Sequence, residues 1–522
     1  MSTPLLVGVD LGTTNIKALA FEPDGRIAAE ASVPTPTHYP RPAWAYHDPE
    51  ALWTATVHSL RRLVERLGDQ ANRVVSLAIA SMGETGLLLD RANKPLTEAI
   101  AWYDQRTVPQ LEQLDHYLGR EAIFRVTGMP LQPIYSLFKI LWLRENRPAD
   151  WAQAVRWLNS ADFIAFRLCG VQATDYSLAT RTLALDLYQL RWADDLLSSL
   201  DLSPDLFAPL MASGKAMARL TADAARETGL PAHVLVSTGG HDHVCGAMAL
   251  GIHRTDTLLD SLGTAEAFFV PVERPLGDPI VGQQGYSQGV IVVSDQPVYY
   301  VLGGLFTSGG SIEWLCDILY REDSEPDYAA LIGEAEQVPP GSLGVCFLPY
   351  LRMSSPPFVD DKAKGAFIGL STDVKRGTLF RAVLEGLACG IRQSMARLWT
   401  YPGVAPQRQF YAIGGGTRNP LLMQIKATVS NQPILIADVV ESTALGAALM
   451  GGLGAGVYPD LTTALSIINI RQQLVEPILE QVPFYQALYE DIFCQLYPTL
   501  LKLHHQIYDL QAGPLSPLKP GG

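Results

Sequence analysis

The chain has 522 residues, of which 48% are hydrophobic and 18% are charged. This balance is typical of a folded globular protein of about two to four domains, and it excludes a disordered or fibrous chain. Asp and Glu (53 residues) outnumber Lys and Arg (39 residues), which gives a formal net charge of −14. Nucleic acid is therefore disfavoured as a partner, because phosphate contacts need clustered basic residues.

Neither the first residues nor the cysteines indicate secretion. The opening MSTPLLVGVDLGTT has no basic stretch followed by a long apolar run, so we expect no signal peptide. The six cysteines form no CxxC pair, which favours reduced thiols and a cytoplasmic location. The uncharged stretch Ser442–Pro459 has 18 residues and five glycines. It predicts a buried helix and loop rather than a membrane span, so we expect no membrane partner.

The first half of the chain alternates short apolar runs with turn residues. Residues 5–9 predict a buried strand, 10–15 a turn, and 16–21 and 26–33 two further strands of an antiparallel meander joined by the hairpin signal Asp24-Gly25. Apolar residues at helical spacing predict a helix over 49–67. The predicted order then runs as strand 74–80, strand 99–103, a mainly helical stretch at about 108–230, strand 234–236, a Gly-Gly turn at 239–240 and helix 244–250.

The opening pattern returns in the second half. VGVDLGTTNIKALAF, from Val7, and TLLDSLGTAEAFFV, from Thr257, both read as apolar strand, Asp, Leu-Gly-Thr and apolar strand, with Ser261 as one extra residue. The repeat predicts a duplicated α/β domain with a cleft between the copies. We expect domains at 1–252 and 253–477, then a C-terminal helix and disordered tail at 478–522. The second half is predicted to contain strands 298–302, 345–348, 409–413 and 433–436 and helices from 311 and at 378–398, 421–430 and 443–453.

Glycine turns after strands predict a phosphate site shared by the two halves. Glycine lets the backbone approach a phosphate closely, and Thr or Lys side chains supply further donors. The candidate phosphate-binding residues are Gly12, Thr13, Thr14 and Lys17 in the first copy and Gly263, Thr264 and Gly309 in the second. Asp10, at the end of the first strand, is the candidate ligand of a hydrated Mg²⁺. No GxxxxGK[ST] is present and no GxGxxG follows the first strand, which disfavours a P-loop or a dinucleotide fold.

Asp242 is the candidate general base. It precedes an apolar helix, where the positive end of the helix dipole should keep its carboxylate ionised. Phosphoryl transfer tolerates such a weak base. A helix-capping Asp without chemistry is the alternative. His241, His243 and Cys245 surround it, but they lack the usual paired spacing of zinc ligands.

Four loop residues are candidates for binding a polyhydroxylated substrate. Glu84 and Asp104 follow two neighbouring strands, and Trp102 and Arg106 lie beside Asp104. Carboxylates accept hydrogen bonds from vicinal hydroxyls, and an aromatic face suits a sugar. Solvated loop charges are the alternative interpretation.

Together these motifs resemble the FGGY family of carbohydrate kinases, over nearly the whole chain from Leu5 to about Tyr458. DLGTTNIK and DSLGTAE look like the family's two phosphate motifs, AIGGGTRNPLLMQIKA like its adenosine motif, and GGHDHVCGA contains the position of its catalytic base, here Asp242. The resemblance implies the duplicated actin/hexokinase-like (RNase H-like) fold and ATP-dependent phosphorylation with Mg²⁺. It also implies nucleotide binding by Gly415, Gly416 and Asn419, and substrate binding by Met82, Glu84, Trp102, Asp104, Arg106, His241 and Asp242.

The substrate pattern departs from two subgroups of the family. Xylulokinases typically carry Met-His in the first sugar loop and glycerol kinases Arg-Glu, whereas this chain has Met82 and Glu84 around Gly83. We expect a ketose, with a pentulose such as xylulose or ribulose first, or a polyol. A non-catalytic sugar- or nucleotide-binding member of the superfold and an ATPase chaperone are the alternatives. A homodimer is the protein partner left open.

Overall fold

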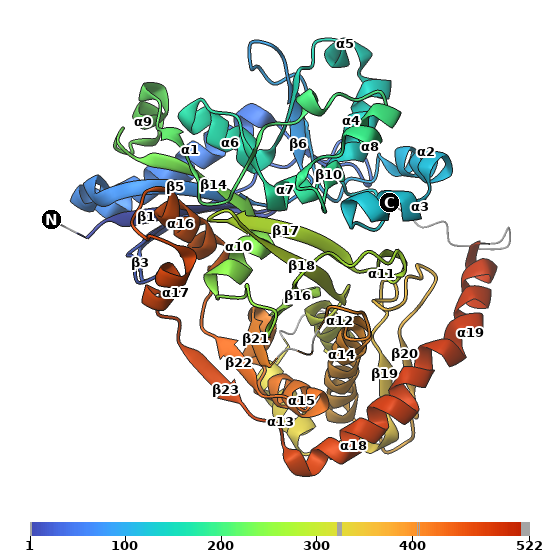
Figure 1. The fold of residues 1–522 in the computed structure, drawn as a ribbon. Helices are drawn as coiled ribbons and strands as arrows, with labels where there is room; N and C mark the ends of the chain where they lie inside the picture. The colour runs from blue at the N-terminus through green and yellow to red at the C-terminus, as the bar shows by residue number, and fades with distance from the viewer. Residues whose placement is uncertain (1–2, 321–325, 405, 407, 513–522) are drawn as a thin grey trace.

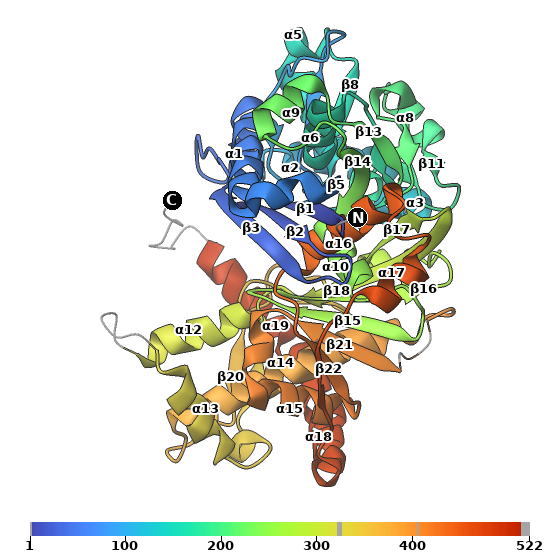
Figure 2. The same ribbon diagram turned by 90° about the vertical axis from the view of Figure 1, so that its left-hand side faces the viewer.

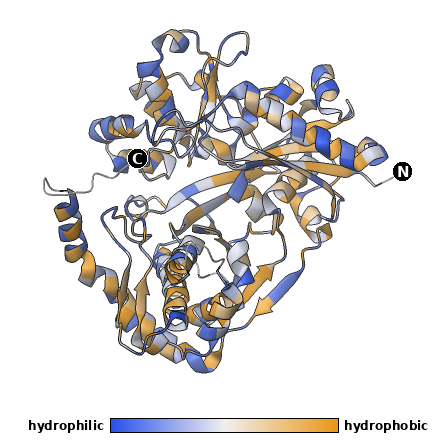
Figure 3. Cartoon of the chain, turned by 180° about the vertical axis from the view of Figure 1, so that it is seen from behind, coloured by the Kyte–Doolittle hydropathy of each residue, from blue (hydrophilic) through white to orange (hydrophobic). Residues whose placement is uncertain are grey.

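The computed structural model describes residues 3–320, 326–404, 406 and 408–512. Two β-sheets lie one above the other with two helices between them, and further helices cover both outer faces (Figures 1 and 2). The strands are mostly hydrophobic, whereas an outer helix such as α1 (Pro49–Leu67) carries both hydrophilic and hydrophobic residues (Figure 3). The duplicated α/β organisation predicted from the repeat is therefore confirmed.

The first sheet contains the opening meander. Its order is β13-β14-β5-β1-β2-β3, with β1 antiparallel to β2 and parallel to β5. All but one of the β1 residues are buried, as expected for a central strand covered on both faces. The strands are β1 (Leu5–Leu11), β2 (Asn15–Phe21), β3 (Ile27–Pro34), β5 (Val74–Ser81), β13 (Ala216–Arg219) and β14 (Leu235–His241).

The rest of the first half is mostly helical, as predicted, with a small four-stranded sheet in the order β4-β7-β6-β8. The strands of that sheet are β4 (Tyr46–His47), β6 (Gly86–Leu89), β7 (Ala99–Ile100) and β8 (Arg156–Asn159). The helices of the first half after α1 are α2 (Val108–Leu118), α3 (Arg120–Thr127), α4 (Ser136–Asn146), α5 (Pro148–Trp151), α6 (Ser160–Cys169), α7 (Tyr176–Thr180), α8 (Asp194–Ser199), α9 (Ala222–Thr228) and α10 (Asp242–Ala249).

The second sheet repeats the first. Its order is β17-β18-β16-β15-β21-β22-β23, and β15 is antiparallel to β16 and parallel to β21, as β1 is to β2 and β5. Its strands are β15 (Thr257–Leu262), β16 (Glu266–Val272), β17 (Ser287–Val293), β18 (Gln296–Leu305), β21 (Gln409–Ile413), β22 (Ile434–Ala437) and β23 (Gln472–Val475). The helices of this half are α11 (Ile280–Gln283), α12 (Gly309–Leu319), α13 (Tyr328–Glu336), α14 (Arg376–Leu398), α15 (Pro420–Ser430), α16 (Ser442–Gly454), α17 (Leu461–Ile467), α18 (Val482–Ala487) and α19 (Cys494–Ala512).

The two inner helices hold the halves together. Helix α16 comes from the second half of the sequence but packs on strands β1, β5 and β14 of the first sheet, and α10 lies between α16 and the second sheet (Figures 1 and 2). The approach is close: a Cβ at Gly8 would lie 1.8 Å from the Ala444 carbonyl oxygen, and one at Gly446 2.0 Å from the Cys245 carbonyl oxygen. Glycine is therefore required at both crossings.

The structure differs from the sequence prediction at residues 239–240. The Gly-Gly pair at 239–240 is not a turn but part of strand β14, because a Cβ at Gly239 would lie 1.9 Å from the Ile79 carbonyl oxygen and only glycine allows β14 to lie so close to β5. The uncharged stretch from Ser442 forms the buried helix α16, as predicted. Among the described residues no helix is long and apolar enough to span a membrane. The predicted disordered tail, apart from Ala512 in α19, lies outside the described residues.

Candidate active site

The first phosphate turn and a predicted sugar loop meet at one place. The turn connects β1 to β2, and the Gly12 amide closes it by donating to the Asn15 carbonyl oxygen at 3.1 Å. Trp102 Nε1 donates to Thr13 Oγ1 at 3.1 Å, and this hydroxyl lies 3.8 Å from Met82 Sδ. Thr14 is exposed beside it. The structure thus brings Thr13 of the predicted phosphate turn together with the predicted substrate residues Met82 and Trp102, and these residues form one wall of the candidate site.

Two carboxylates from different elements of this wall lie near each other. Asp10 is near the end of β1, and Asp242 is the first residue of α10. Burial, and after it the neighbouring Asp242 carboxylate, raise the pKa of Asp10 to about 7. Burial also acts to raise the pKa of Asp242, but His243 acts against it through its side chain and its backbone amide, and the pKa of Asp242 lies below its usual range. Asp242 is therefore ionised near neutral pH, the state that a general base requires.

His241 and His243 orient the Asp242 carboxylate. Asp242 Oδ1 accepts a hydrogen bond from the His243 amide at 2.6 Å and lies 3.2 Å from His241 Nε2. Burial lowers the pKa of His241 to about 3, so this imidazole is neutral. Burial likewise raises the pKa of the Cys245 thiol well above its usual range. No cluster of three or more His, Cys, Asp or Glu side chains suited to a metal ion occurs in the part of the chain that the structure describes.

Asp10 and Asp242 nevertheless fit the demands of Mg²⁺. This ion is usually held by one or two carboxylates and keeps several waters or substrate phosphate oxygens. The Asp10 carboxylate has no hydrogen-bond partner among the described residues, and burial together with the nearby Asp242 carboxylate raises its pKa. Lys17 acts to lower the pKa of Asp10 but does not outweigh burial and Asp242. Its Nζ donates hydrogen bonds to both carboxylate oxygens of Glu441, at 2.7 and 2.9 Å.

The sugar loop contains a buried ion pair that the sequence did not reveal. Arg181, just after α7, donates through Nε to Glu84 Oε1 at 2.5 Å, and both side chains are largely buried. Its side chain also packs over Gly83, where a Cβ would lie 2.9 Å from Arg181 Cγ. Burial lowers the pKa of Arg181, but Glu84 outweighs that effect and raises it overall. Glu84 Oε2 has no hydrogen-bond partner among the described residues.

Lys139 of α4 is a second residue that sequence reasoning missed. Its ammonium group is fully buried and donates to the carbonyl oxygens of Glu84, at 3.0 Å, and Ile134. Burial lowers the pKa of Lys139 to about 7. The backbone of Glu84 is unusual as well, with φ at +62°. Ser136 Oγ also donates to the Glu84 carbonyl oxygen at 3.0 Å, so two side chains of α4 hold this loop in a conformation that an L-residue rarely adopts.

Asp104 and Arg106 lie behind the wall and bind each other. Asp104 Oδ1 accepts from the Arg106 amide and Nε, and Oδ2 accepts from Arg106 Nη2 and the Ala45 amide, all within 2.9 Å. Both side chains are at least 99% buried, and the Arg106 guanidinium stacks on Trp44 at 4.1 Å. Both Asp104 oxygens are thus occupied within the protein. A direct role in substrate binding remains a prediction that these contacts do not favour.

The predicted nucleotide residues of the second half also gather. The β15–β16 turn is joined to the start of α12 by hydrogen bonds from the Gly309 amide to the Gly263 carbonyl oxygen and from the Gly310 amide to the Thr264 carbonyl oxygen, each 3.0 Å. The turn at 414–416 lies against Leu262 of β15, because a Cβ at Gly414 would lie 2.4 Å from the Leu262 carbonyl oxygen. Gly415 is exposed, with open space around it, and Gly416 packs on Leu262. Asn419 caps α15 by accepting from the Leu422 amide at 3.1 Å.

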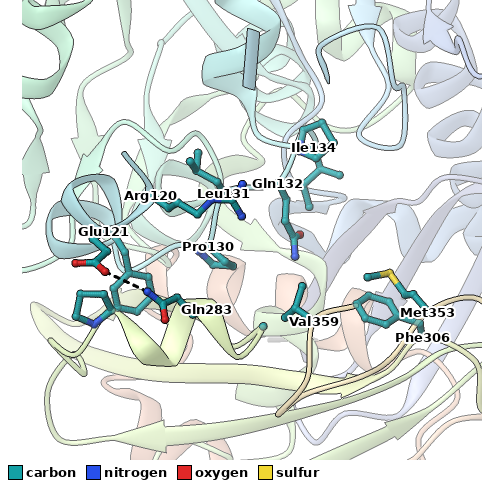
Figure 4. A pocket seen from close by; sticks show the side chains of 15 residues that line it. Arg120, Glu121, Pro130, Leu131, Gln132, Ile134, Gln283, Phe306, Met353 and Val359 are labelled. Atoms are coloured by element: carbon teal, nitrogen blue, oxygen red, sulfur yellow. Dashed lines mark hydrogen bonds between the residues drawn. The ribbon is translucent and has the colours of Figure 1, made fainter. Parts of the chain in front are cut away.

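A pocket of about 490 Å³ lies between the halves, beside the sugar loops (Figure 4). Its first-half wall is formed by α3 and residues 130–134, which lead directly into Tyr135 and α4, and its second-half wall by α11, Phe306, Met353 and Val359. Gln283 Nε2 donates to Glu121 Oε1 at 3.2 Å across it. None of the predicted site residues lines this pocket, so it is a neighbour of the candidate site and not the site itself.

Comparison with known proteins identifies the family. Residues 5–249 match the model of the N-terminal domain of the FGGY family of carbohydrate kinases, and residues 258–455 match that of its C-terminal domain. The chain therefore belongs to this family, and it is an ATP-dependent kinase that phosphorylates a sugar or polyol with Mg²⁺ as cofactor. The predicted domain boundary near residue 252 lies between the two matched ranges and stays a prediction.

Three proteins illustrate the similarity. A glycerol kinase of Gloeobacter violaceus is 31% identical over 460 residues, which cover 87% of this chain and 89% of the relative. A gluconokinase of Bacillus subtilis is 24% identical over 519 residues, or 98% and 99% of the two chains. The crystal structure of a xylulose kinase from Rhodospirillum rubrum superposes with a TM-score of 0.87 at 28% identity and covers 96% of this chain and 100% of that one. These relatives act on different substrates, so similarity alone does not define the substrate.

Proposed function

We propose that this kinase transfers the γ-phosphate of ATP to a hydroxyl of a neutral ketose or polyol, with a pentulose such as xylulose or ribulose as the first candidate. Asp242 is the general base. The observation that carries the proposal is the position of the Asp242 carboxylate at the start of α10, beside Asp10 and on the same wall as Glu84 and Trp102.

The residues divide the work of phosphoryl transfer. Asp242 accepts the proton of the attacking hydroxyl, and the neutral His241 beside it keeps the carboxylate in place. Glu84 accepts a hydrogen bond from the substrate through its free oxygen. The turns at 12–14 and 263–264, one from each half, bind the phosphates through backbone amides and Thr hydroxyls. Asp10, with Asp242 nearby, would hold Mg²⁺, which neutralises charge on the transferred phosphate when bound.

The charges around the sugar loop favour a neutral substrate over a sugar acid. Binding a carboxylate substrate needs a cation that is free to meet it. Arg181 is already paired with Glu84, and Arg106 with Asp104. Lys139 is fully buried, and its ammonium group is taken up by two backbone carbonyl oxygens. Among the described residues, these three cations near Glu84 are thus satisfied inside the protein, so none of them is free to bind the carboxylate of an aldonate such as gluconate.

A coupled ADP-release assay over a substrate panel tests this proposal. The panel contains pentuloses, hexuloses, glycerol and other polyols, and gluconate as the charged competitor. We expect the highest kcat/KM with a neutral ketose, and a pentulose ahead of a hexulose. Preferential phosphorylation of gluconate would contradict the substrate assignment while leaving the kinase activity intact. Binding without phosphorylation of any panel member would favour the non-catalytic alternative.

Location and assembly complete the proposal. We place the protein in the cytoplasm, where ATP is available and where its six cysteines, all of them free, would remain reduced. A homodimer is the partner that the sequence left open, and an exposed apolar stripe on α19, formed by Leu503, Ile507 and Leu510, supports it. Sedimentation velocity of the wild type and a Leu503→Gln/Leu510→Gln variant tests this assembly, and identical monomeric profiles would exclude it.

A further inference from the structure

Asp10 and Asp260 occupy equivalent places in the two halves but meet different partners. Each follows the apolar run of the first strand of its sheet, one or two residues before Leu-Gly-Thr. The Asp10 carboxylate has no hydrogen-bond partner among the described residues. The Asp260 carboxylate is fully buried, and its Oδ2 accepts a hydrogen bond from Lys426 Nζ at 2.5 Å. In the second half, the ammonium group of Lys426 therefore lies beside Asp260, at the position that a bound metal ion would occupy beside Asp10 in the first half.

Lys426 connects the second phosphate turn to the helix that follows the adenosine turn. It belongs to α15, and its side chain is 99% buried. Its ammonium group contacts Asp260 near the end of β15 and Glu266 at the start of β16, so it holds both strands that enter and leave the turn at 263–264. Burial acts to lower the pKa of Lys426, but the two carboxylates outweigh it and raise this pKa, so the group stays charged.

The same cluster reaches the third nucleotide segment. Glu266 Oε2 accepts a hydrogen bond from Ser308 Oγ at 2.6 Å, and Ser308 immediately precedes Gly309 and α12. Its amide in turn donates to the Thr264 carbonyl oxygen at 2.9 Å. One buried ammonium group thus links, directly or through Glu266, the turns at 263–264, 309–310 and 414–419. We assign all three turns to the nucleotide, and none of these hydrogen bonds involves the sugar loop.

We propose that Lys426, together with Asp260 and Glu266, is a positioning residue for the nucleotide phosphates. Its ammonium group holds the second phosphate turn, at 263–264, in place, as a bound Mg²⁺ would do at the first phosphate turn. This inference rests on the proposed assignment of Gly263 and Thr264 to the phosphates. A role in stability alone is the competing explanation, because any buried ion pair is costly to break. A positioning role predicts that loss of Lys426 weakens nucleotide binding but not sugar binding. A purely structural role predicts that both affinities decrease together.

Three variants separate them. Lys426→Met removes the cation. The triple variant Asp260→Asn/Glu266→Gln/Lys426→Met replaces all three ionisable side chains by neutral ones, so no buried charge is left unpaired and the protein can still fold if the single variant does not. The matched control is Arg381→Met. Arg381 is also buried in the second half and is bonded to Glu385 at 3.0 Å and Tyr485 at 3.0 Å, but that cluster joins α14 to α18, away from the nucleotide turns.

The readouts are calorimetric binding of ATP, ADP and adenosine, and KM for ATP and for the sugar. Losing a residue that orients the ligands of a metal typically costs about 10- to 100-fold in affinity, and we take the same range for a residue that orients a phosphate turn. We expect that loss for ATP and ADP in both Lys426 variants, with adenosine affinity and sugar KM nearly unchanged. Arg381→Met should lower the melting temperature without changing nucleotide affinity.

Two results would overturn the inference. If the triple variant folds and binds ATP as tightly as the wild type, Lys426 does not position the phosphates. Equal losses of nucleotide and sugar affinity in the Lys426 variants would indicate general destabilisation instead. The variant Thr264→Val distinguishes an error in the Lys426 inference from an error in the phosphate assignment. If Thr264→Val weakens ATP binding while the triple variant does not, only the Lys426 inference is wrong. If Thr264→Val also has no effect, the phosphate assignment itself fails.

Discussion

Replacing Arg181 by Met should reveal how strongly the sugar loop depends on its buried ion pair. The Glu84 and Arg181 side chains expose only 4% and 12% of their surface, so the substitution leaves a carboxylate buried without its cation. Breaking such a pair costs about 3–5 kcal/mol of unfolding free energy. Because 1 kcal/mol shifts the melting temperature of a 150–250-residue unit by about 2–4 °C, we expect a decrease of about 6–20 °C in the transition that reports the first half.

Scanning calorimetry measures the decrease, and steady-state kinetics should show a raised KM for the sugar with KM for ATP nearly unchanged. The double variant Glu84→Gln/Arg181→Met leaves no unpaired charge and should recover part of the lost stability, but not the sugar affinity. Arg26→Met, which breaks the exposed pair with Asp24, is the control and should leave the melting temperature nearly unchanged. An Arg181→Met protein that melts within about 2 °C of the wild type and binds the sugar normally would refute the reasoning.

Three further predictions concern the base, pH and domain movement. Asp242→Asn should lower kcat by about 10²–10⁴ while ATP still binds, and near-normal turnover would remove Asp242 from the mechanism. Burial raises the pKa of Asp162 from 3.8 to about 8, so the folded state holds a proton that the unfolded state releases. The contribution of Asp162 to the free energy of unfolding is complete below pH 4 and is lost as the pH rises to 8. The midpoint of urea unfolding should therefore change more between pH 5 and pH 8 in the wild type than in Asp162→Asn. Equal changes in the two proteins would contradict this prediction. Because the phosphate turns come from both halves, sugar and a non-hydrolysable ATP analogue together should draw the halves inward, and small-angle scattering should show a smaller radius of gyration than either ligand alone gives.

The sequence was most informative where function depends on a short contiguous motif. The turn after β1, its repeat after β15 and the position of Asp242 at the start of α10 could all be predicted, because strand, turn and helix signals there are local. Arg181, Lys139 and Lys426 could not be predicted. Each lies on or next to a helix and contacts a residue more than 50 positions away in the chain, and no spacing pattern in the sequence predicts such a contact.

Two interpretations of loop residues illustrate the same limit. Asp104 follows a strand beside an aromatic residue, a pattern typical of a substrate loop, yet both its oxygens bind Arg106 and backbone amides. The Gly239-Gly240 pair is typical of a turn, yet it lies within β14 because neighbouring β5 leaves no room for a side chain. The Ala45 amide that binds Asp104 and the Ile79 carbonyl oxygen that lies against Gly239 both come from distant parts of the chain, so neither contact could be predicted from the local sequence.

The position of α16 has a consequence for biosynthesis. Strands β1 and β5 emerge from the ribosome early, but the helix that covers their inner face begins only at Ser442, near the end of the chain. Apolar residues of those strands, among them Leu6 and Ala78, thus lack their native cover during most of translation. We therefore expect chaperones to bind the nascent first half until α16 has been synthesised. A protein truncated before Ser442 should be degraded and should not act as a functional half-enzyme.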